Sequence, residues 1–161
     1  MIRLKNPYAQ MEGYNCFGCS PVNPFGLKME FFEEGDELIC NWNPGNEFAG
    51  FHDILHGGIQ ATMIDEIASW VVLVKLDTSG LTLRLNARYR ESVRISKGGI
   101  SLRARLVEVR RSIATIHVQL LDGEGKLCSE GTVDYFIFPR ERAVTDFHYP
   151  GKEAFYYEDM R

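Results

Sequence analysis

One long amphipathic helix limits what this chain can fold into. Between Ile59 and Val74 the apolar residues recur at intervals of three and four, which predicts one face of a helix of about four to five turns. These residues are Ile59, Met63, Ile67, Trp70, Val71 and Val74. It is the only convincing long helix in the sequence, and the residues from Leu81 onward alternate as strands do. A single helix among many strands has to be the element on which the sheet packs.

Strands are expected on both sides of that helix. Their predicted bounds are Leu27–Glu33, Glu37–Trp42, Leu81–Arg90, Ile100–Val109, Ile113–Leu121 and Leu127–Phe138. Along Leu81–Arg90 the odd positions are almost all apolar and the even positions polar, which predicts a strand with one solvent-facing side. The order of elements predicts an α+β fold, in which antiparallel strands curl around the helix. Such a half-barrel leaves edge strands and one side of the helix open, so we expect dimerisation.

Length and charge narrow the class of protein. The chain has 161 residues, enough for one domain with a real core, and no stretch comes near the roughly twenty apolar residues of a membrane span. The charged start of the sequence is not followed by an apolar h-region, so a secretory signal is not expected; the cytoplasm is the expected location, and membrane binding is not expected. From Met29 to Val74 there are nine acidic residues and no lysine or arginine, whereas Lys75 to Arg111 holds ten lysines and arginines and three acidic residues. This asymmetry fits either complementary solvated faces or a basic rim for an anionic ligand.

The start of the helix carries the most unusual chemistry. Gly57 and Gly58, after His56, leave backbone N–H groups bare where a helix N-terminus carries partial positive charge. About two turns further on, Asp65 shares a face with small apolar residues, which is unusual for a core helix. We expect the functional site here. The plainer alternatives are that His56-Gly57-Gly58 is an ordinary turn and that Asp65 is an ordinary helix carboxylate. Glu66, next to Asp65, competes with it for any catalytic role.

A second motif is Cys16-Phe17-Gly18-Cys19. It lies in an irregular N-terminal segment rich in proline and glycine, residues 1–26, which we call the leader. Such a pair can belong to a zinc or a redox site. A closed zinc site needs four ligands, and no second pair follows, because Cys40 and Cys128 stand singly in expected strands. A redox pair is expected beside a helix in a βαβ unit, which is absent. The favoured interpretation is a structural loop with inward-packed thiols and no metal.

These features together resemble the hotdog-fold acyl-CoA thioesterases of the 4-hydroxybenzoyl-CoA and PaaI-like superfamily. The resemblance rests on the element order, on His56-Gly57-Gly58 with an acid seven residues after the second glycine, and on the opening around Cys16 and Cys19. It covers about residues 14–138. It implies one hotdog domain over residues 1–161, with five to six antiparallel strands around the helix, an irregular leader and a C-terminal tail. It also implies a homodimer or dimer of dimers, a cytoplasmic enzyme, and no cofactor besides the coenzyme A of the substrate.

The implied activity is hydrolysis of an acyl-CoA to a carboxylate and free coenzyme A. Asp65 is the expected general base or nucleophile, and the amide of Gly57 or Gly58 the expected oxyanion hole. His56 would shape the turn or contact the thioester. Thr82, near the start of the next strand, would orient water. Since Thr82 falls on the polar side of that strand with Arg84, it can reach the site only if the strand end twists or if it acts across a dimer interface.

Substrate-binding roles are expected for Gly58, His52, Arg94 and Lys97. In the PaaI-like branch an Asn often stands six residues before the motif histidine; here that residue is Gly50, and His52 is a possible substitute. Arg94 and Lys97 would hold the phosphates of coenzyme A, unless the basic residues only pair with the acidic half of the chain.

Two other functions fit the same fold. An acyl-CoA hydratase or dehydratase would use an Asp and His pair at the helix start, which only Asp53 with His56 could imitate. A non-catalytic acyl-CoA-binding module would need no base at all. Binding to nucleic acid is not expected, since no helix-turn-helix pattern is present.

Overall fold

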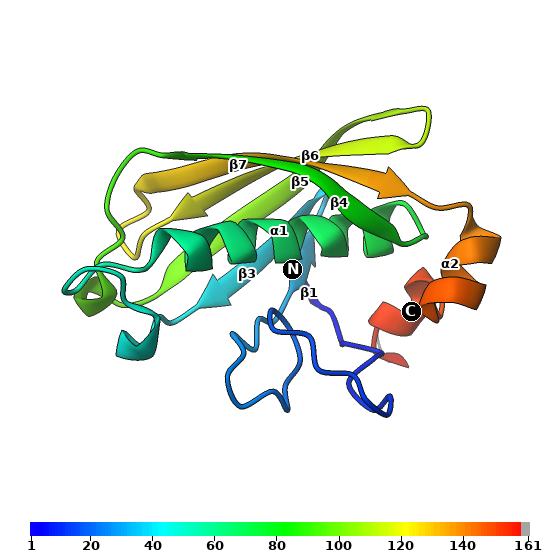
Figure 1. Cartoon of the computed structure of the whole chain (residues 1–161), viewed down its shortest axis with the longest axis horizontal. Helices are drawn as coiled ribbons and strands as arrows, with labels where there is room; N and C mark the ends of the chain where they lie inside the picture. Colours follow the sequence, from blue (N-terminus) through cyan, green and yellow to red (C-terminus); the bar gives the residue numbers. More distant parts are fainter. Residues whose placement is uncertain (159–161) are drawn as a thin grey trace.

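The computed structural model describes residues 1–158 and is built around one antiparallel sheet that curves over a long helix (Figure 1). The strands are β1 (Ile2–Arg3), β2 (Phe32–Glu34), β3 (Glu37–Trp42), β4 (Gly80–Tyr89), β5 (Ile100–Arg110), β6 (Ile113–Leu121) and β7 (Leu127–Ile137). Their order across the sheet is β1-β2-β3-β5-β6-β7-β4. The α+β fold class is therefore confirmed. The sheet has one strand more than the five to six expected. The additional strand is β1, which pairs with β2.

Helix α1 (Gly57–Lys75) lies along the inner side of the sheet and fills the core. Met63, Ile67 and Val71, at the predicted spacing, have no exposed surface. The helix comes close to β7 at Gly131, where a Cβ atom would lie 2.7 Å from the Ile64 side chain. Contrary to the expectation from the sequence, α1 is long and apolar enough to cross a membrane by length and composition. Its apolar character has a simpler cause here, because the helix is enclosed in the core of the fold.

Strand β4 forms one edge of the sheet, and within residues 1–158 its one partner strand is β7. The register between β4 and β7 shifts between Thr82 and Arg84, so Leu83 is the extra residue of a β-bulge. The predicted alternation fails at this point. Leu81 and Leu83 are 54% and 56% exposed, whereas Leu85 and Ala87, beyond the bulge, pack against the core.

Both chain ends pack on the side of α1 that the sheet leaves open, which was expected to remain uncovered in one chain (Figure 1). The ring centroid of Trp70 on α1 lies 4.3 Å from that of Phe31 and 5.3 Å from that of Phe155. The C-terminal segment, expected as a tail, contains α2 (Arg140–Phe147) and the short 3-10 helix η3 (Lys152–Phe155). Two further short 3-10 helices are η1 (Asn46–Phe48) and η2 (Ile95–Lys97).

Predicted and observed strands differ mainly in the first hairpin. Leu27, Met29 and Phe31 are buried as a strand would bury them, but only Phe32–Glu34 pairs with β3. The preceding residues instead bond to the leader, with the Leu27 and Met29 N–H groups donating to the carbonyls of Phe17 and Gly18. The other predicted strands agree with the structure to within one residue at each end.

Candidate active site

The carboxylate of Asp65 is held between α1 and the edge of the sheet by two hydroxyl groups. Asp65 Oδ1 accepts hydrogen bonds from Thr82 Oγ1 at 2.9 Å and from the Tyr135 hydroxyl at 2.6 Å. The Tyr135 hydroxyl also lies 2.7 Å from the Asp65 carbonyl oxygen. Since both donors reach Oδ1, the second carboxylate oxygen is the one that can face a substrate. Burial and the nearby Asp65 charge raise the pKa of Tyr135, so this tyrosine stays a proton donor.

The β-bulge in β4 explains how Thr82 reaches Asp65 within one chain. Thr82 pairs with Tyr135, and beyond the bulge Leu85 pairs with Val133. Tyr135 and Val133 are both buried, so Thr82 and Leu85 lie on the inner face of the sheet although one number is even and the other odd. A continuous two-residue alternation would have put Thr82 on the outer face with Arg84. The inserted residue of the β-bulge, and not a gradual twist of the strand end, turns Thr82 toward Asp65.

His56 and Gly57 form the first turn of α1. His56 is the N-cap, and its Nδ1 accepts a hydrogen bond of 2.8 Å from the Gly58 N–H. The Gly57 carbonyl accepts a 2.6 Å bond from the Tyr89 hydroxyl. Among residues 1–158 the Gly57 N–H has no hydrogen-bond acceptor, as is usual in the first turn of a helix. Of the two amides expected for an oxyanion hole, the one that is free to bind a ligand is that of Gly57.

Gly50 packs directly against His56. A Cβ atom at this position would lie 3.3 Å from the His56 Cα atom and 3.4 Å from its imidazole ring. A Cβ atom here would require His56, the helix N-cap, to give by a few tenths of an ångström. The glycine that stands where the resembling enzymes often carry Asn is thus packed closely against His56.

His52 and Arg94 line a pocket of about 620 Å³, together with Asp53 and Ser96. The Asp53 carboxylate accepts bonds of 2.7 Å from both the backbone N–H and the hydroxyl of Ser96, and Arg94 lies 3.9 Å from it. The hydrogen bonds from Ser96 lower the pKa of Asp53. Two of the four expected substrate-binding residues thus meet in one pocket.

The other two lie elsewhere. Gly58 sits in the first turn of α1, and the Lys97 ammonium pairs with Glu124 at 2.8 Å in a surface contact. The Lys97 pair joins two residues outside the acidic first half of the chain, while Arg94 faces an acid of that half. The Arg94 pair fits complementary charged faces, whereas the Lys97 pair fits neither interpretation, and the basic rim for an anionic ligand stays a prediction.

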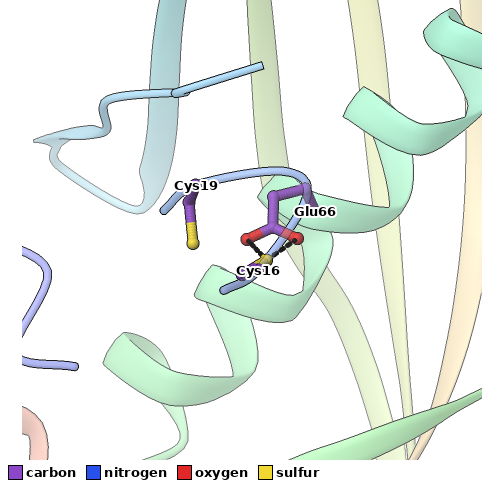
Figure 2. Close-up of side chains that lie close together, drawn as sticks. All are labelled: Cys16, Cys19 and Glu66. Carbon is purple, nitrogen blue, oxygen red and sulfur yellow. Dashed lines mark hydrogen bonds between the residues drawn. The ribbon is translucent and has the colours of Figure 1, made fainter. Parts of the chain in front are cut away.

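Glu66 faces the N-terminal leader, where its carboxylate meets Cys16 and Cys19 (Figure 2). Burial raises the pKa of the Glu66 carboxyl to about 7. Hydrogen bonds from Cys19 and from the backbone lower the pKa of the Cys16 thiol to about 5. Asp65 and Glu66 are neighbours in sequence that serve two different clusters.

Sequence reasoning missed Tyr135. A signal was present, because alternation along the last strand places Tyr135 on the inward face with Val133. A tyrosine that faces a core needs a hydrogen-bond partner for its hydroxyl. What the sequence could not show is that the partner is Asp65, seventy residues earlier.

Comparison with known proteins supports the fold and the family resemblance. Residues 52–129 match the family model of the thioesterase superfamily. A protein of Thermoplasma acidophilum that is named as an esterase is 28% identical over 87 residues, which are 53% of this chain and 64% of that protein. The matched region thus spans less than two thirds of that relative.

Solved structures share the fold at low identity. A thioesterase of Haemophilus influenzae superposes with a TM-score of 0.64 at 22% identity, over 70% of this chain and 79% of that one. A Streptococcus mutans protein bound to acetyl-CoA gives a TM-score of 0.65 at 16% identity, over 81% and 98%. A thioesterase-like protein of Streptococcus pneumoniae with coenzyme A gives 0.64 at 19%, over 70% and 90%. The fold and the resemblance drawn from the sequence are confirmed.

Proposed function

We propose that this hotdog-fold protein of the thioesterase superfamily is an acyl-CoA thioesterase, which hydrolyses the thioester to a carboxylic acid and coenzyme A. The observation that carries the proposal is the Asp65 carboxylate, held at the sheet edge by Thr82 and Tyr135 with one oxygen left to face a substrate. The family match and the esterase name of the Thermoplasma relative support a hydrolase of this class.

In the proposed reaction Asp65 either takes a proton from water or attacks the carbonyl carbon itself. On the water route, oxygen adds to the carbonyl carbon, and the negative charge moves to the carbonyl oxygen. The Gly57 N–H, at the positive end of α1, is the donor that would bind this oxyanion. The carbon–sulfur bond then breaks, and the coenzyme A thiolate leaves and takes up the proton that Asp65 accepted from water, which regenerates the carboxylate. Thr82 and Tyr135 keep Asp65 oriented throughout.

The distance between these groups implies that two copies of the chain share each site. Gly57 and Asp65 are eight residues apart on one helix, which is about 12 Å along its axis. A single carbonyl cannot lie within about 3 Å of both. A second copy related by a two-fold axis would bring its own Gly57 to the Asp65 of the first copy.

Strand β4 offers the surface for such pairing. Its outer edge has no partner strand among residues 1–158, and it carries exposed Leu81 and Leu83. Antiparallel pairing of β4 with its copy, centred near Asn86, would place Thr82 of one copy opposite Tyr89 of the other. Thr82 binds Asp65 and Tyr89 binds Gly57, so this register joins the two halves of each site.

The pocket of His52 and Arg94 is the proposed place for the phosphates of coenzyme A. An arginine at the pocket surface suits charge-assisted hydrogen bonds to phosphate oxygens. Two proteins of the same fold were solved with acetyl-CoA or coenzyme A, which supports a CoA ester as the substrate.

A hydratase or dehydratase is less well supported. The Asp53 carboxylate binds Ser96 and faces Arg94, while His56 Nδ1 accepts the Gly58 N–H. The Asp and His pair that such an enzyme would need is therefore not formed.

The test is to incubate the purified protein with a panel of acyl-CoAs and enoyl-CoAs in the presence of a thiol reagent. Thiol release supports the thioesterase. Addition of water to an enoyl-CoA without thiol release would show a hydratase, and binding without turnover would show a binding module. Either of these two outcomes would overturn the proposal.

A further inference from the structure

The leader loop Cys16–Cys19 and helix α1 bring three potential metal ligands together. Cys16 Sγ lies 3.5 Å from both carboxylate oxygens of Glu66, and one ligand atom each from Cys16, Cys19 and Glu66 lie within 4.8 Å of one another. Figure 2 shows the carboxylate and the two sulfur atoms pointing into one space between the loop and the helix. The two parts of this cluster are fifty residues apart in the sequence.

The distances fit a tetrahedral ion. With bonds of about 2.3 Å to sulfur and 2.1 Å to oxygen, two ligands at the tetrahedral angle are about 3.6 Å apart. The observed separation between Cys16 Sγ and the Glu66 oxygens is 3.5 Å. Two residues between the cysteines is also the usual spacing of a zinc-binding pair. The sequence interpretation favoured no metal because a second cysteine pair is absent; the third potential ligand, which the sequence could not place there, is a glutamate on the helix.

The surroundings of the cluster suit a bound cation. Gly18 lies so close to Glu66 that a Cβ atom there would be 2.5 Å from the carboxylate and would displace it, so the glycine lets Glu66 keep its place in the cluster. Among residues 1–158 no lysine or arginine forms an ion pair with Glu66. A divalent cation would supply the missing positive charge.

We propose that Cys16, Cys19 and Glu66 form a binding site for a divalent transition metal of zinc type, which fixes the leader to α1. Two thiolates and a carboxylate are ligands that zinc accepts, and they leave a fourth position. The Tyr14 hydroxyl lies 3.0 Å from Cys19 Sγ, so this position is open to Tyr14 or to water. Because Glu66 follows Asp65 on the helix, the site would hold the leader against the turn of α1 that carries the proposed base. The proposal does not depend on the thioesterase activity.

The experiment uses the full chain, stripped of metal with a chelator under reducing conditions. One equivalent of zinc is then added, and the bound metal is measured by mass spectrometry after gel filtration. We expect one zinc per chain and a rise in Tm. Loading with cobalt instead should give the sulfur-to-cobalt charge-transfer absorption and the visible bands of a tetrahedral thiolate site. This spectrum is measured on the wild-type chain, so it does not depend on the folding of a variant.

Three variants and one control assign the ligands. Cys16→Ser, Cys19→Ser and Glu66→Gln should each weaken zinc binding by more than the roughly 10–100-fold known for partners outside the ligand shell. Cys128→Ser, which changes a buried thiol on β7, should bind zinc as the wild type does. The proposal is overturned if the wild-type chain retains no zinc and shows no cobalt–thiolate absorption, or if Cys16 and Cys19 form a disulfide instead. Zinc binding that Glu66→Gln leaves unchanged would also overturn it.

Discussion

The adjacent carboxylates of Asp65 and Glu66 on α1 lie in different surroundings. Asp65 accepts hydrogen bonds from two hydroxyls at the sheet edge, whereas Glu66 faces two thiols under the leader. Neighbouring helix residues are rotated by about 100° from one another, so a helix between two layers sends them to different layers. The chemistry of each residue is therefore set by the element it faces.

At the residue scale, Asp65→Asn should remove nearly all thioester turnover while acyl-CoA still binds, because the amide cannot act as base or nucleophile. The loss is expected to be about 10²-fold or more. Turnover and binding are measured separately, by thiol release and by calorimetry. Asp146→Asn is the matched control, since Asp146 lies on α2 and pairs only with its own helix. Full turnover in Asp65→Asn would refute the assignment.

The Gly57 amide can be removed without changing the helix. Gly57 is the first helical residue, and the preceding His56 has φ −56° and ψ 132°, a conformation that proline accepts after it. Gly57→Pro should lower kcat by about 10²–10³-fold, because the oxyanion loses its donor. Gly57→Ala keeps the N–H, and its Cβ would meet the Tyr89 ring at an ordinary 3.5 Å. Equal activities of the two variants would show that this amide is not the donor.

At the scale of elements, the loop before α1 is tied to η2 by Asp53 and Ser96. Because these bonds lower the pKa of Asp53 in the folded state, they stabilise the fold above the unfolded pKa of about 3.9 and are lost as pH falls through the lower, folded value. Asp53 has φ 59°, a conformation that Asn also tolerates, so Asp53→Asn is a fair comparison.

Urea denaturation of both proteins from pH 6 to pH 2 measures this contribution. The difference in unfolding free energy between wild type and Asp53→Asn should be constant above about pH 5 and shrink below about pH 4. If the difference does not change with pH, the charge of the Asp53 carboxylate contributes nothing to the free energy of unfolding.

The same loop holds the proposed phosphate pocket. Arg94→Ala should raise KM for acyl-CoA with little change in kcat, and should not affect short thioesters that lack the nucleotide. Added salt should weaken binding of the CoA ester in the wild type. Arg142→Ala on α2, where Arg142 pairs with Asp146, serves as the control. If Arg94→Ala lowers stability and leaves KM unchanged, Arg94 belongs to the fold and the carrier binds elsewhere.

For the whole molecule, the proposed dimer predicts that Leu83→Glu yields a folded monomer with little activity. Leu83 lies on the unpaired edge of β4 and is 56% exposed, so a charge there opposes pairing with a second copy more than it disturbs the core. Val144→Glu is the control, because Val144 is an exposed apolar residue on α2. Sedimentation at micromolar concentration gives the assembly state. A monomeric wild type would contradict the dimer.

Mixing two inactive variants tests whether the site is shared between copies. Dimers formed from Asp65→Asn and Gly57→Pro chains contain one site with both defects and one with neither. Random reassociation of equal amounts should therefore restore about a quarter of the wild-type activity. No recovery, in mixtures shown to exchange subunits, would mean that both groups act within one chain.

Much of the fold could be read from the sequence, because helix and strand periodicities are local. The apolar spacing from Ile59 to Val74 predicted α1 within two residues, and the alternation after Ile100 predicted the strands β5 to β7 within one residue. Asp65 and the His56-Gly57-Gly58 turn were identified in the same way, since motif and acid lie on one continuous element. The match of residues 52–129 to the thioesterase superfamily agrees with the family resemblance drawn from the sequence, while the roles of these residues stay predictions.

Only the tertiary structure decided which groups meet. The bulge at Leu83, which turns Thr82 toward Asp65, exists only in the pairing of β4 with β7. Tyr135 reaches Asp65 across seventy residues, and Cys16 reaches Glu66 across fifty. Even at the helix start, the bond from the Gly58 N–H to His56 depends on the rotamer of one side chain. The sequence determines the faces of each element, whereas contacts between distant elements depend on register and packing, which no local pattern encodes.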